Sequence, residues 1–402
     1  MAKQKEKFDI KKYFKVRYNR LRGWYYRHFK PVQKNKVVFS QFGGKSYGCN
    51  PRAICDEFLR RGEDYELVWI VGKGMDAKKA GLPEGVRASK GKKVLYDLET
   101  AKVWVNNIHF NTLLNEGLKK RDETIYLNTF HGGITLKHQV RDKHSYKEID
   151  IKSLKERMYV KDSECVDYIT CGCDMEIHVL EEFFYGYGEI LKLGDARTDM
   201  LVNGSPEMEQ KVRDFYQIPK GTKIAIYAPT FRASKSLSCY DLDFDRILDY
   251  LEERDGCPWV MLIRLHPRLA QKTAEIVPDS PRYISASDYV DMQELSVASD
   301  IMISDYSSVI TDFMLTRKPA FMYVPDLDHY IEKRGMYFEM EDLPFPYARS
   351  NDEFMQNLKL FDEKKYCEKV DAFVKKIGYI DDGQSAKRIV DFLIEKMKGQ
   401  EE

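Results

Sequence analysis

The chain has 402 residues, of which 43% are hydrophobic and 13% aromatic, and its formal net charge is +1. This composition excludes a largely disordered protein, and the length predicts two domains rather than one core. The longest apolar runs, such as Trp259–Ile263, are far shorter than the roughly 20 residues of a membrane span. The N-terminus lacks the apolar segment of a secretory signal, and eight scattered cysteines predict free thiols in an intracellular protein.

Residues 1–35 are expected to form a basic amphipathic arm. Residues 1–36 carry thirteen Lys or Arg and two acids, a net of +11, so residues 37–402 carry −10. Aromatic residues alternate with these cations, as is typical of a helix that lies in a membrane interface. The alternatives are an arm that binds nucleic acid and a solvated tail without a partner. We expect residues 1–30 to bind an anionic membrane surface and not nucleic acid, which places the protein peripherally on the cytoplasmic face of the membrane.

Short apolar runs alternate with segments of helical periodicity after the arm. This alternation predicts an α/β fold of parallel sheets covered by helices on both faces. A polar break near residues 199–206 separates two such doubly wound, Rossmann-like domains, which we assign to residues 36–203 and 204–402. Ligands of such domains bind at the carboxyl ends of the strands, in a cleft that the domains would share. The predicted strands cover residues 36–42, 66–71, 102–106, 124–129, 168–171, 190–193, 223–227, 259–265, 283–285, 300–304 and 319–324.

Two histidines follow predicted strands at this cleft. His131 ends the 124–129 strand and is followed by Gly132, which allows close approach of a ligand, while His266 ends the 259–265 strand. A histidine at such a position can accept a proton from a hydroxyl nucleophile or donate a hydrogen bond to phosphate. The alternative is a purely structural histidine, but equivalent positions in the two domains favour a functional pair.

The segment from Asp300 to Lys318 predicts a strand, a turn through Ser304–Ser308 and an amphipathic helix. Ser307 or Ser308 then lies at the N-cap, where unpaired backbone N–H groups and the helix dipole favour a phosphate. A serine that only caps the helix is the alternative.

Several motifs together resemble the CDP-glycerol glycerophosphotransferase family of teichoic acid synthesis, over about residues 36–390. They occur in the family's order at Tyr227–Arg232, Arg264–Pro267, Ser304–Val309, Lys318–Pro319, Asp326–Tyr330, Arg334–Gly335 and Asp382–Gly383. Three segments depart from the family pattern, among them His131–Lys137, which reads HGGITLK where HGTPLK is usual. These departures leave open the identity of the acceptor and whether the alditol is glycerol.

The resemblance implies a GT-B type fold and transfer of glycerol phosphate from CDP-glycerol to a lipid-linked polyprenyl or polymer acceptor, with release of CMP. From charge and geometry we assign His131 as the general base and His266 as the group that stabilises the diphosphate or leaving group. Positioning and electrostatic stabilisation would supply most of the rate. The implied substrate-binding residues are Gly132, Thr230, Arg232, Arg264, Ser304, Asp305, Ser307, Ser308 and Asp328.

Alternatives within the same fold are a CDP-ribitol-using ribitolphosphotransferase and a nucleotide-sugar glycosyltransferase. A binding module without catalytic activity is less consistent with two histidines at the cleft. The pairs Asp241/Asp243 and Asp326/Asp328 resemble the Asp-x-Asp that holds a metal in other nucleotide-sugar transferases. We nevertheless expect no metal and no other cofactor, because a helix dipole and cations can neutralise a diphosphate.

Overall fold

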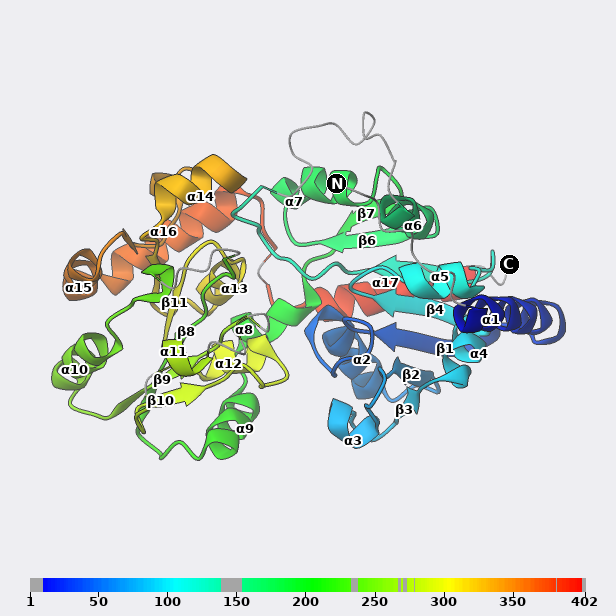
Figure 1. The fold of residues 1–402 in the computed structure, drawn as a ribbon, viewed down its shortest axis with the longest axis horizontal. Coiled ribbons are helices and arrows are strands. Elements are labelled where there is room, and N and C mark those ends of the chain that lie inside the picture. Colours follow the sequence, from blue (N-terminus) through cyan, green and yellow to red (C-terminus); the bar gives the residue numbers. More distant parts are fainter. Residues whose placement is uncertain are drawn as a thin grey trace.

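The computed structural model describes residues 10–138, 154–232, 238–266, 269, 273–277, 279–380 and 382–399. Two parallel β-sheets lie in separate lobes, each covered by helices (Figure 1). This arrangement confirms the predicted α/β fold of two Rossmann-like domains of the GT-B type.

The first sheet has seven strands in the order β3-β2-β1-β4-β5-β6-β7, all parallel. The order reverses between β1 and β4, which is the topological switch point where doubly wound folds bind ligands. The strands are β1 (Gln33–Ser40), β2 (Glu66–Ile70), β3 (Val86–Ser89), β4 (Ala101–Asn106), β5 (Ile125–Asn128), β6 (Tyr168–Cys171) and β7 (Glu189–Lys192). The helices of this part are α1 (Ile10–Phe29), α2 (Cys49–Arg61), α3 (Ala77–Ala80), α4 (Lys92–Glu99), α5 (Asn111–Glu116), α6 (Leu154–Ser163) and α7 (Asp174–Phe183), with η2 (Ala196–Thr198) following β7.

The second sheet repeats this topology with six parallel strands in the order β10-β9-β8-β11-β12-β13. Its switch point lies between β8 and β11. The strands are β8 (Lys223–Tyr227), β9 (Trp259–Ile263), β10 (Tyr283–Ser285), β11 (Ile301–Ser304), β12 (Ala320–Tyr323) and β13 (Tyr347–Ala348). The accompanying helices are α8 (Asp199–Asn203), α9 (Pro206–Tyr216), η3 (Ser238–Tyr240), α10 (Phe244–Asp255), α11 (Thr273–Ile276), α12 (Met292–Ala298), α13 (Val309–Phe313), η5 (Met314–Thr316), α14 (Leu327–Arg334), η6 (Met340–Asp342), α15 (Asn351–Lys359), α16 (Glu363–Lys376) and α17 (Ser385–Gly399).

The strands form where apolar runs are too short for a helix and both faces of the sheet are buried. Every residue of β4 is buried, and β9 and β11 are almost wholly so. Continuous apolar strands of this kind are expected in parallel sheets, which helices cover on both faces. α10 illustrates the helix boundaries, because the Asp243 carboxylate accepts from the Arg246 N–H at its start and left-handed Gly256 ends it.

The last helix returns to the first lobe. Ile389, Val390 and Leu393 of α17 are fully buried in the core that contains β1 and β4, although the chain has by then completed the second sheet. Figure 1 shows α17 crossing between the lobes. The C-terminal segment therefore ties the two lobes together.

All eleven predicted strands are present, with ends within three residues of the predicted ones. Two further strands, β3 and β13, were not predicted. Both are short and lie at sheet edges, and β13 has only two residues, so neither carries a recognisable apolar run.

Within the predicted arm, residues Ile10–Phe29 form α1, which packs against α4 and α5, and the arm's last residues from Gln33 begin β1. Gly23 allows this packing, since a Cβ there would lie 2.7 Å from the carbonyl oxygen of Gly117. Among the helices of the described ranges, none is long and apolar enough to cross a membrane. Residues 1–9 of the arm lie outside the described residues.

Candidate active site

The turn after β11 is held against the end of β8 at the second switch point. The Ser304 hydroxyl donates to the Ala228 carbonyl at 2.7 Å, and the Thr230 N–H donates to the Asp305 carboxylate at 2.9 Å. Ser304 and Asp305 are almost completely buried. Both predicted residues therefore shape the turn, and neither has an exposed side chain.

Arg232 lies in a buried ion network beside this turn. Its guanidinium contacts the Asp326 carboxylate at 2.8 Å and the Asp305 carboxylate at 3.0 Å, and it donates to the Thr230 carbonyl. The stacked rings of Tyr306 and Tyr330 lie 4.8 and 4.9 Å from the guanidinium. The side chain predicted to pair with phosphate is thus surrounded by carboxylates and aromatic rings, and it supports the walls of the site.

A cavity of about 410 Å³ opens at this edge of the second sheet. Lys137 lines it from the segment that leaves the first sheet and packs on the second lobe, and Arg264, His266 and Ser307 line it from the second lobe. Burial lowers the pKa of Lys137, and Arg334 and Arg232 act in the same direction against the opposing effect of Asp305. Burial also lowers the pKa of Arg264, whose guanidinium donates to the carbonyls of Ala286 and Tyr289 at 2.8 Å.

Three cations or potential cations therefore line one cavity, together with hydroxyls. The Thr230 hydroxyl also lines it, and its oxygen is buried without a hydrogen-bond partner among the described residues. Such a set of donors fits the negative charge of a diphosphate. His266 is exposed toward this space and its ring contacts that of Phe231.

The predicted strand, turn and helix of the serine segment are confirmed. α13 begins at Val309, which places Ser308 at the N-cap, and the Val309 N–H donates to the Ser307 hydroxyl at 3.4 Å. The Ser308 side chain makes no capping hydrogen bond. Ser307 lines the cavity, and both serines remain partly exposed.

His131 lies at the carboxyl edge of the first sheet. Its Nδ1 is 3.0 Å from the Asn107 carbonyl, which can only accept, so Nδ1 carries the proton and Nε2 of the neutral ring is left with a lone pair. The surrounding protein lowers the pKa of His131 through desolvation, opposed by the Asn107 carbonyl and reinforced by Arg197 and His109. The residue is still exposed to solvent. A neutral ring with a lone pair on Nε2 is what a general base requires.

The segment 131–137 connects the two edges. Ile134 and Leu136 are buried in the core of the second lobe, and the Thr311 hydroxyl of α13 donates to the Ile134 carbonyl at 2.9 Å. Lys137 pairs with Met336 in an antiparallel bridge. His131, at the edge of the first sheet, and Lys137, which lines the cavity at the second sheet, therefore belong to one firmly packed segment.

A buried salt bridge between the lobes lies under this segment. Arg197 of η2 binds both oxygens of Asp312 of α13 at 2.9 Å and one oxygen of Asp195 at 2.9 Å. Gly133 is required beside it, because a Cβ there would lie 2.4 Å from Asp312 and 2.6 Å from Arg197. Gly133 therefore allows the two lobes to pack closely at this point.

The structure does not bring every predicted residue to the cavity. Asp328 is exposed on α14 and forms a bidentate pair with Arg349. Gly132 lies beside Gly133 at a small separate hollow. Among the described residues no group of three or more His, Cys, Asp or Glu side chains is placed to hold a metal ion.

Four residues of this region were not among the predicted site residues: Lys137, Asp326, Arg197 and Asp312. Asp326 lies in one of the motifs that carried the resemblance, whereas Lys137 and Arg197 lie in two of the segments that depart from the family pattern, residues 131–137 and 194–199. Membership of these segments was the available signal. Nothing in the local sequence around Asp312 distinguishes it from an ordinary helix acid. Its role depends on a partner 115 residues away.

Comparison with known proteins identifies the family. The sequence profile of CDP-glycerol:poly(glycerophosphate) glycerophosphotransferases matches residues 24–395. The chain belongs to this family. The predicted resemblance is thereby confirmed, and the matched range includes every predicted site residue.

Relatives within this glycerophosphotransferase family act in teichoic acid synthesis. A teichoic acid poly(glycerol phosphate) polymerase of Bacillus subtilis (strain 168) is 29% identical over 90% of this chain and 48% of its own length. A teichoic acid glycerol-phosphate transferase of Staphylococcus aureus (strain NCTC 8325 / PS 47) is 29% identical over 89% of this chain and 92% of its own length. The chain spans about half the length of the first of these relatives and nearly all of the second.

Solved structures of the wall teichoic acid polymerase TagF share the fold. One TagF structure matches with a TM-score of 0.78 and 25% identity, covering 98% of this chain and 100% of that one. A histidine-to-asparagine TagF variant soaked with CDPG matches with a TM-score of 0.79 and 25% identity, over 98% and 100% of the two chains.

Proposed function

We propose that this protein transfers glycerol phosphate from CDP-glycerol to a hydroxyl of a lipid-linked or polymer acceptor, in teichoic acid or related surface-polymer synthesis. The acceptor oxygen bonds to the alditol-side phosphorus, the bond from that phosphorus to the bridging oxygen breaks, and CMP leaves. The acceptor proton passes to Nε2 of His131. The observation that carries the proposal is the cation-lined cavity at the edge of the second sheet in a member of this family.

The donor would occupy this cavity of about 410 Å³. Lys137, Arg264 and His266 would neutralise the diphosphate, and His266 would stabilise the leaving CMP. Ser307 and Thr230 would add hydroxyl donors. The proposal includes no metal ion, so absence of a cofactor remains a prediction.

The proposed base, His131, would act from the carboxyl edge of the first sheet. His131 is held by the Asn107 carbonyl, and the lowered pKa keeps its ring neutral near pH 7. Segment 131–137 would set the distance between this base and the donor phosphates, since both ends of the segment are packed against fixed elements.

The membrane would bind to the outward face of α1. Eight of the thirteen large hydrophobic side chains that are exposed in the described part of the chain lie on this helix: Ile10, Tyr13, Phe14, Tyr18, Leu21, Trp24, Tyr25 and Phe29. Basic residues flank them, as in helices that lie in an anionic interface. We therefore propose peripheral attachment to the cytoplasmic face of the membrane.

The test of transfer is CMP release by the purified protein from CDP-glycerol, CDP-ribitol or a nucleotide sugar, with a lipid-linked glycerol phosphate acceptor. We expect CDP-glycerol to be the preferred donor. CDP-ribitol is the second candidate, because a poly(ribitol-phosphate) polymerase of Bacillus spizizenii is 25% identical over 90% of this chain. Sugar transfer without alditol phosphate transfer would contradict both candidates.

Membrane attachment is tested by vesicle flotation of the double variant Phe14→Ser/Leu21→Ser. Ile331→Ser, at an exposed position of α14, is the control. We expect the double variant to lose most binding to vesicles that contain phosphatidylglycerol, while the control binds as the wild type. Equal binding by all three proteins would exclude α1 as the anchor.

A further inference from the structure

His109 and Asp162 form a buried pair in the first lobe. Nδ1 of His109 is 2.6 Å from Oδ2 of Asp162, and their side chains are 4% and 0% exposed. A carboxylate only accepts hydrogen bonds, so Nδ1 of His109 carries the proton. Its Nε2 is buried and has no hydrogen-bond partner among the residues that the structure describes. Hydrogen bonding therefore holds the His109 ring through Nδ1.

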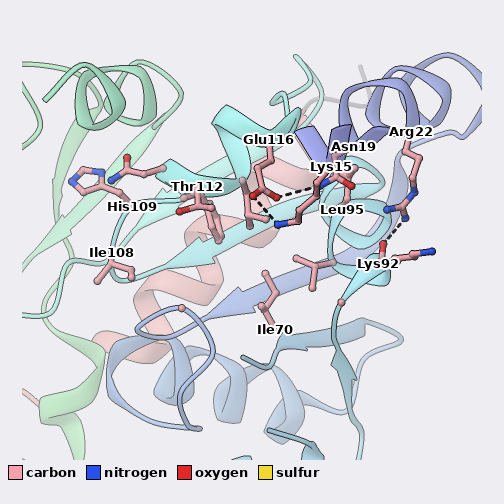
Figure 2. A pocket seen from close by; sticks show the side chains of 16 residues that line it. Lys15, Asn19, Arg22, Ile70, Lys92, Leu95, Ile108, His109, Thr112 and Glu116 are labelled. Carbon is pink, nitrogen blue, oxygen red and sulfur yellow. Dashed lines mark hydrogen bonds and ion pairs between the residues drawn. The ribbon is translucent and has the colours of Figure 1, made fainter. Parts of the chain in front are cut away.

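His109 stands at the inner end of a cavity of about 660 Å³ that lies beneath α1 (Figure 2). Lys15 and Arg22 line the opposite end of this cavity. The rings of Phe183 and Tyr159 pack against the imidazole, with centroids 5.2 and 4.8 Å away. The His109 side chain thus borders an open space, yet protein contacts set its orientation.

The same carboxylate shapes the loop that follows β4. Oδ1 of Asp162 accepts from the Phe110 N–H at 2.8 Å, so the carboxylate binds two successive residues of the loop 107–110. At the start of the loop, the Asn106 side chain accepts from the Asn107 N–H at 3.0 Å. Asn106 and Asp162 are both completely buried. Buried side chains therefore fix the path of the loop at both of its ends.

The carbonyl that orients His131 belongs to this loop. The Asn107 carbonyl, two residues before His109, is 3.0 Å from Nδ1 of His131. Without this acceptor, the proton of the neutral imidazole can move to Nε2, which then has no lone pair for the proton of a nucleophile. The path of the loop therefore decides whether His131 can act as a base.

Ring contacts provide a second connection between the two histidines. Phe183 is stacked on His109 at an interplanar angle of 16°, and its centroid lies 4.7 Å from that of Phe130. The Phe130 ring in turn lies 4.7 Å from the His131 ring. Phe130 has a φ of 50°, a left-handed conformation that side chains disfavour, and its N–H donates to the Asn128 side chain at 2.9 Å. Such a conformation persists only where the surrounding contacts hold it.

We propose that Asp162 and His109 are positioning residues for His131: their hydrogen bond fixes the loop 107–110, and the loop fixes the tautomer of the base. Neither residue contacts a substrate in this role. The inference rests on the proposed function for the identity of the base. It adds that the base depends on a buried carboxylate that does not touch it.

Two substitutions of His109 separate its hydrogen bond from its ring. His109→Asn keeps a donor near the position of Nδ1, whereas His109→Phe keeps the ring and removes the donor. We expect His109→Phe to lower kcat for CMP release at least roughly tenfold, with an unchanged KM for CDP-glycerol, because the base is misplaced. His109→Asn should retain most of the activity. His178→Phe, at a mostly exposed histidine of α7, is the control and should match the wild type.

Nitrogen-15 NMR of the histidine side chains at pH 8, without substrate, reports the tautomer of His131. His131→Gln, which lacks the ring, identifies its signals. Wild-type protein and His109→Asn should carry the proton on Nδ1, whereas His109→Phe should show a substantial population with the proton on Nε2. Asp162→Asn leaves one accepting oxygen for two donors, so it should shift the tautomer in the same direction.

The outcomes separate this inference from the proposed function. A changed His131 tautomer in His109→Phe with unchanged turnover would support the positioning pair and contradict His131 as the base. An unchanged tautomer in both His109→Phe and Asp162→Asn would overturn the inference, whether or not the protein releases CMP. Equal losses of kcat in His109→Phe and His109→Asn would also overturn it, because Nε2 of His109, which both variants lack, would then act directly.

Discussion

The carboxyl edges of the two sheets differ in charge although their strand orders are alike. The second edge borders a cavity with Lys137, Arg264 and His266, whereas the first presents a neutral His131 next to a cavity without lysine or arginine at its inner end. Doubly wound folds bind ligands at such switch points, and side chains decide which ligand each one fits. A diphosphate suits the second edge, and an uncharged nucleophile with its base suits the first.

The two edges act together only if the lobes keep their relative position. Breaking the salt bridge between the lobes therefore has the largest expected effect. Asp312→Ala removes the bidentate partner of buried Arg197, which should cost about 3–5 kcal/mol of unfolding free energy. Urea unfolding measures this loss. Asp352→Ala breaks the exposed Arg246 pair and should cost at most about 1 kcal/mol. Similar losses in the two variants would mean that the interlobe pair does not secure the lobes.

Removing either histidine tests the division of roles. His131→Ala and His266→Ala should each lower kcat for CMP release at least roughly a hundredfold, the usual contribution of acid–base help. His131→Ala should leave the KM for the donor unchanged, because the proposed diphosphate site lies at the other edge. His178→Ala, at a mostly exposed histidine of α7, is the control. Unchanged turnover in both cleft variants would refute the assigned roles.

Lys137 tests whether the segment that connects the two sheets contributes to the proposed donor cavity. Lys137→Ala removes one charged donor, and we expect about a tenfold higher KM for CDP-glycerol, in line with one charge-assisted hydrogen bond. Steady-state kinetics at varied CDP-glycerol concentrations measure this KM. Lys333→Ala, an exposed lysine of α14, should show no change. An unchanged KM in Lys137→Ala would exclude Lys137 from donor binding.

The smallest expected effect is the pH dependence of kcat/KM near neutrality. The pKa of His131 lies below its ordinary value, so its base form already predominates at pH 7 and kcat/KM should change little between pH 7 and 8. Below the lowered pKa, protonation removes the base, and kcat/KM should fall about tenfold per pH unit. His131→Ala should abolish this acidic limb in its residual activity. Persistence of the limb would assign it to another group.

Much of the fold could be predicted because its signals are local. The strands 168–171, 223–227 and 283–285 have the predicted bounds, since each is a short apolar run between polar segments. The serine turn follows from an apolar strand next to a helical repeat, and both histidines are placed by the strands that precede them. The site was less predictable. Arg232 is as basic in sequence as Arg264, yet it pairs with Asp305 and Asp326, which lie 73 and 94 residues further along the chain.

The sequence by itself determined two doubly wound sheets, a basic aromatic helix and the positions of His131, His266 and Ser307 at strand ends, because each depends on periodicity or on immediate neighbours. Only the tertiary structure decided the partners of charged groups, including the Arg197–Asp312 bridge and the placement of Lys137 in the donor cavity. It also decided the return of α17 to the first lobe and the cavity beneath α1. Such features arise when segments up to hundreds of residues apart pack together, and packing geometry is not encoded in any single local pattern.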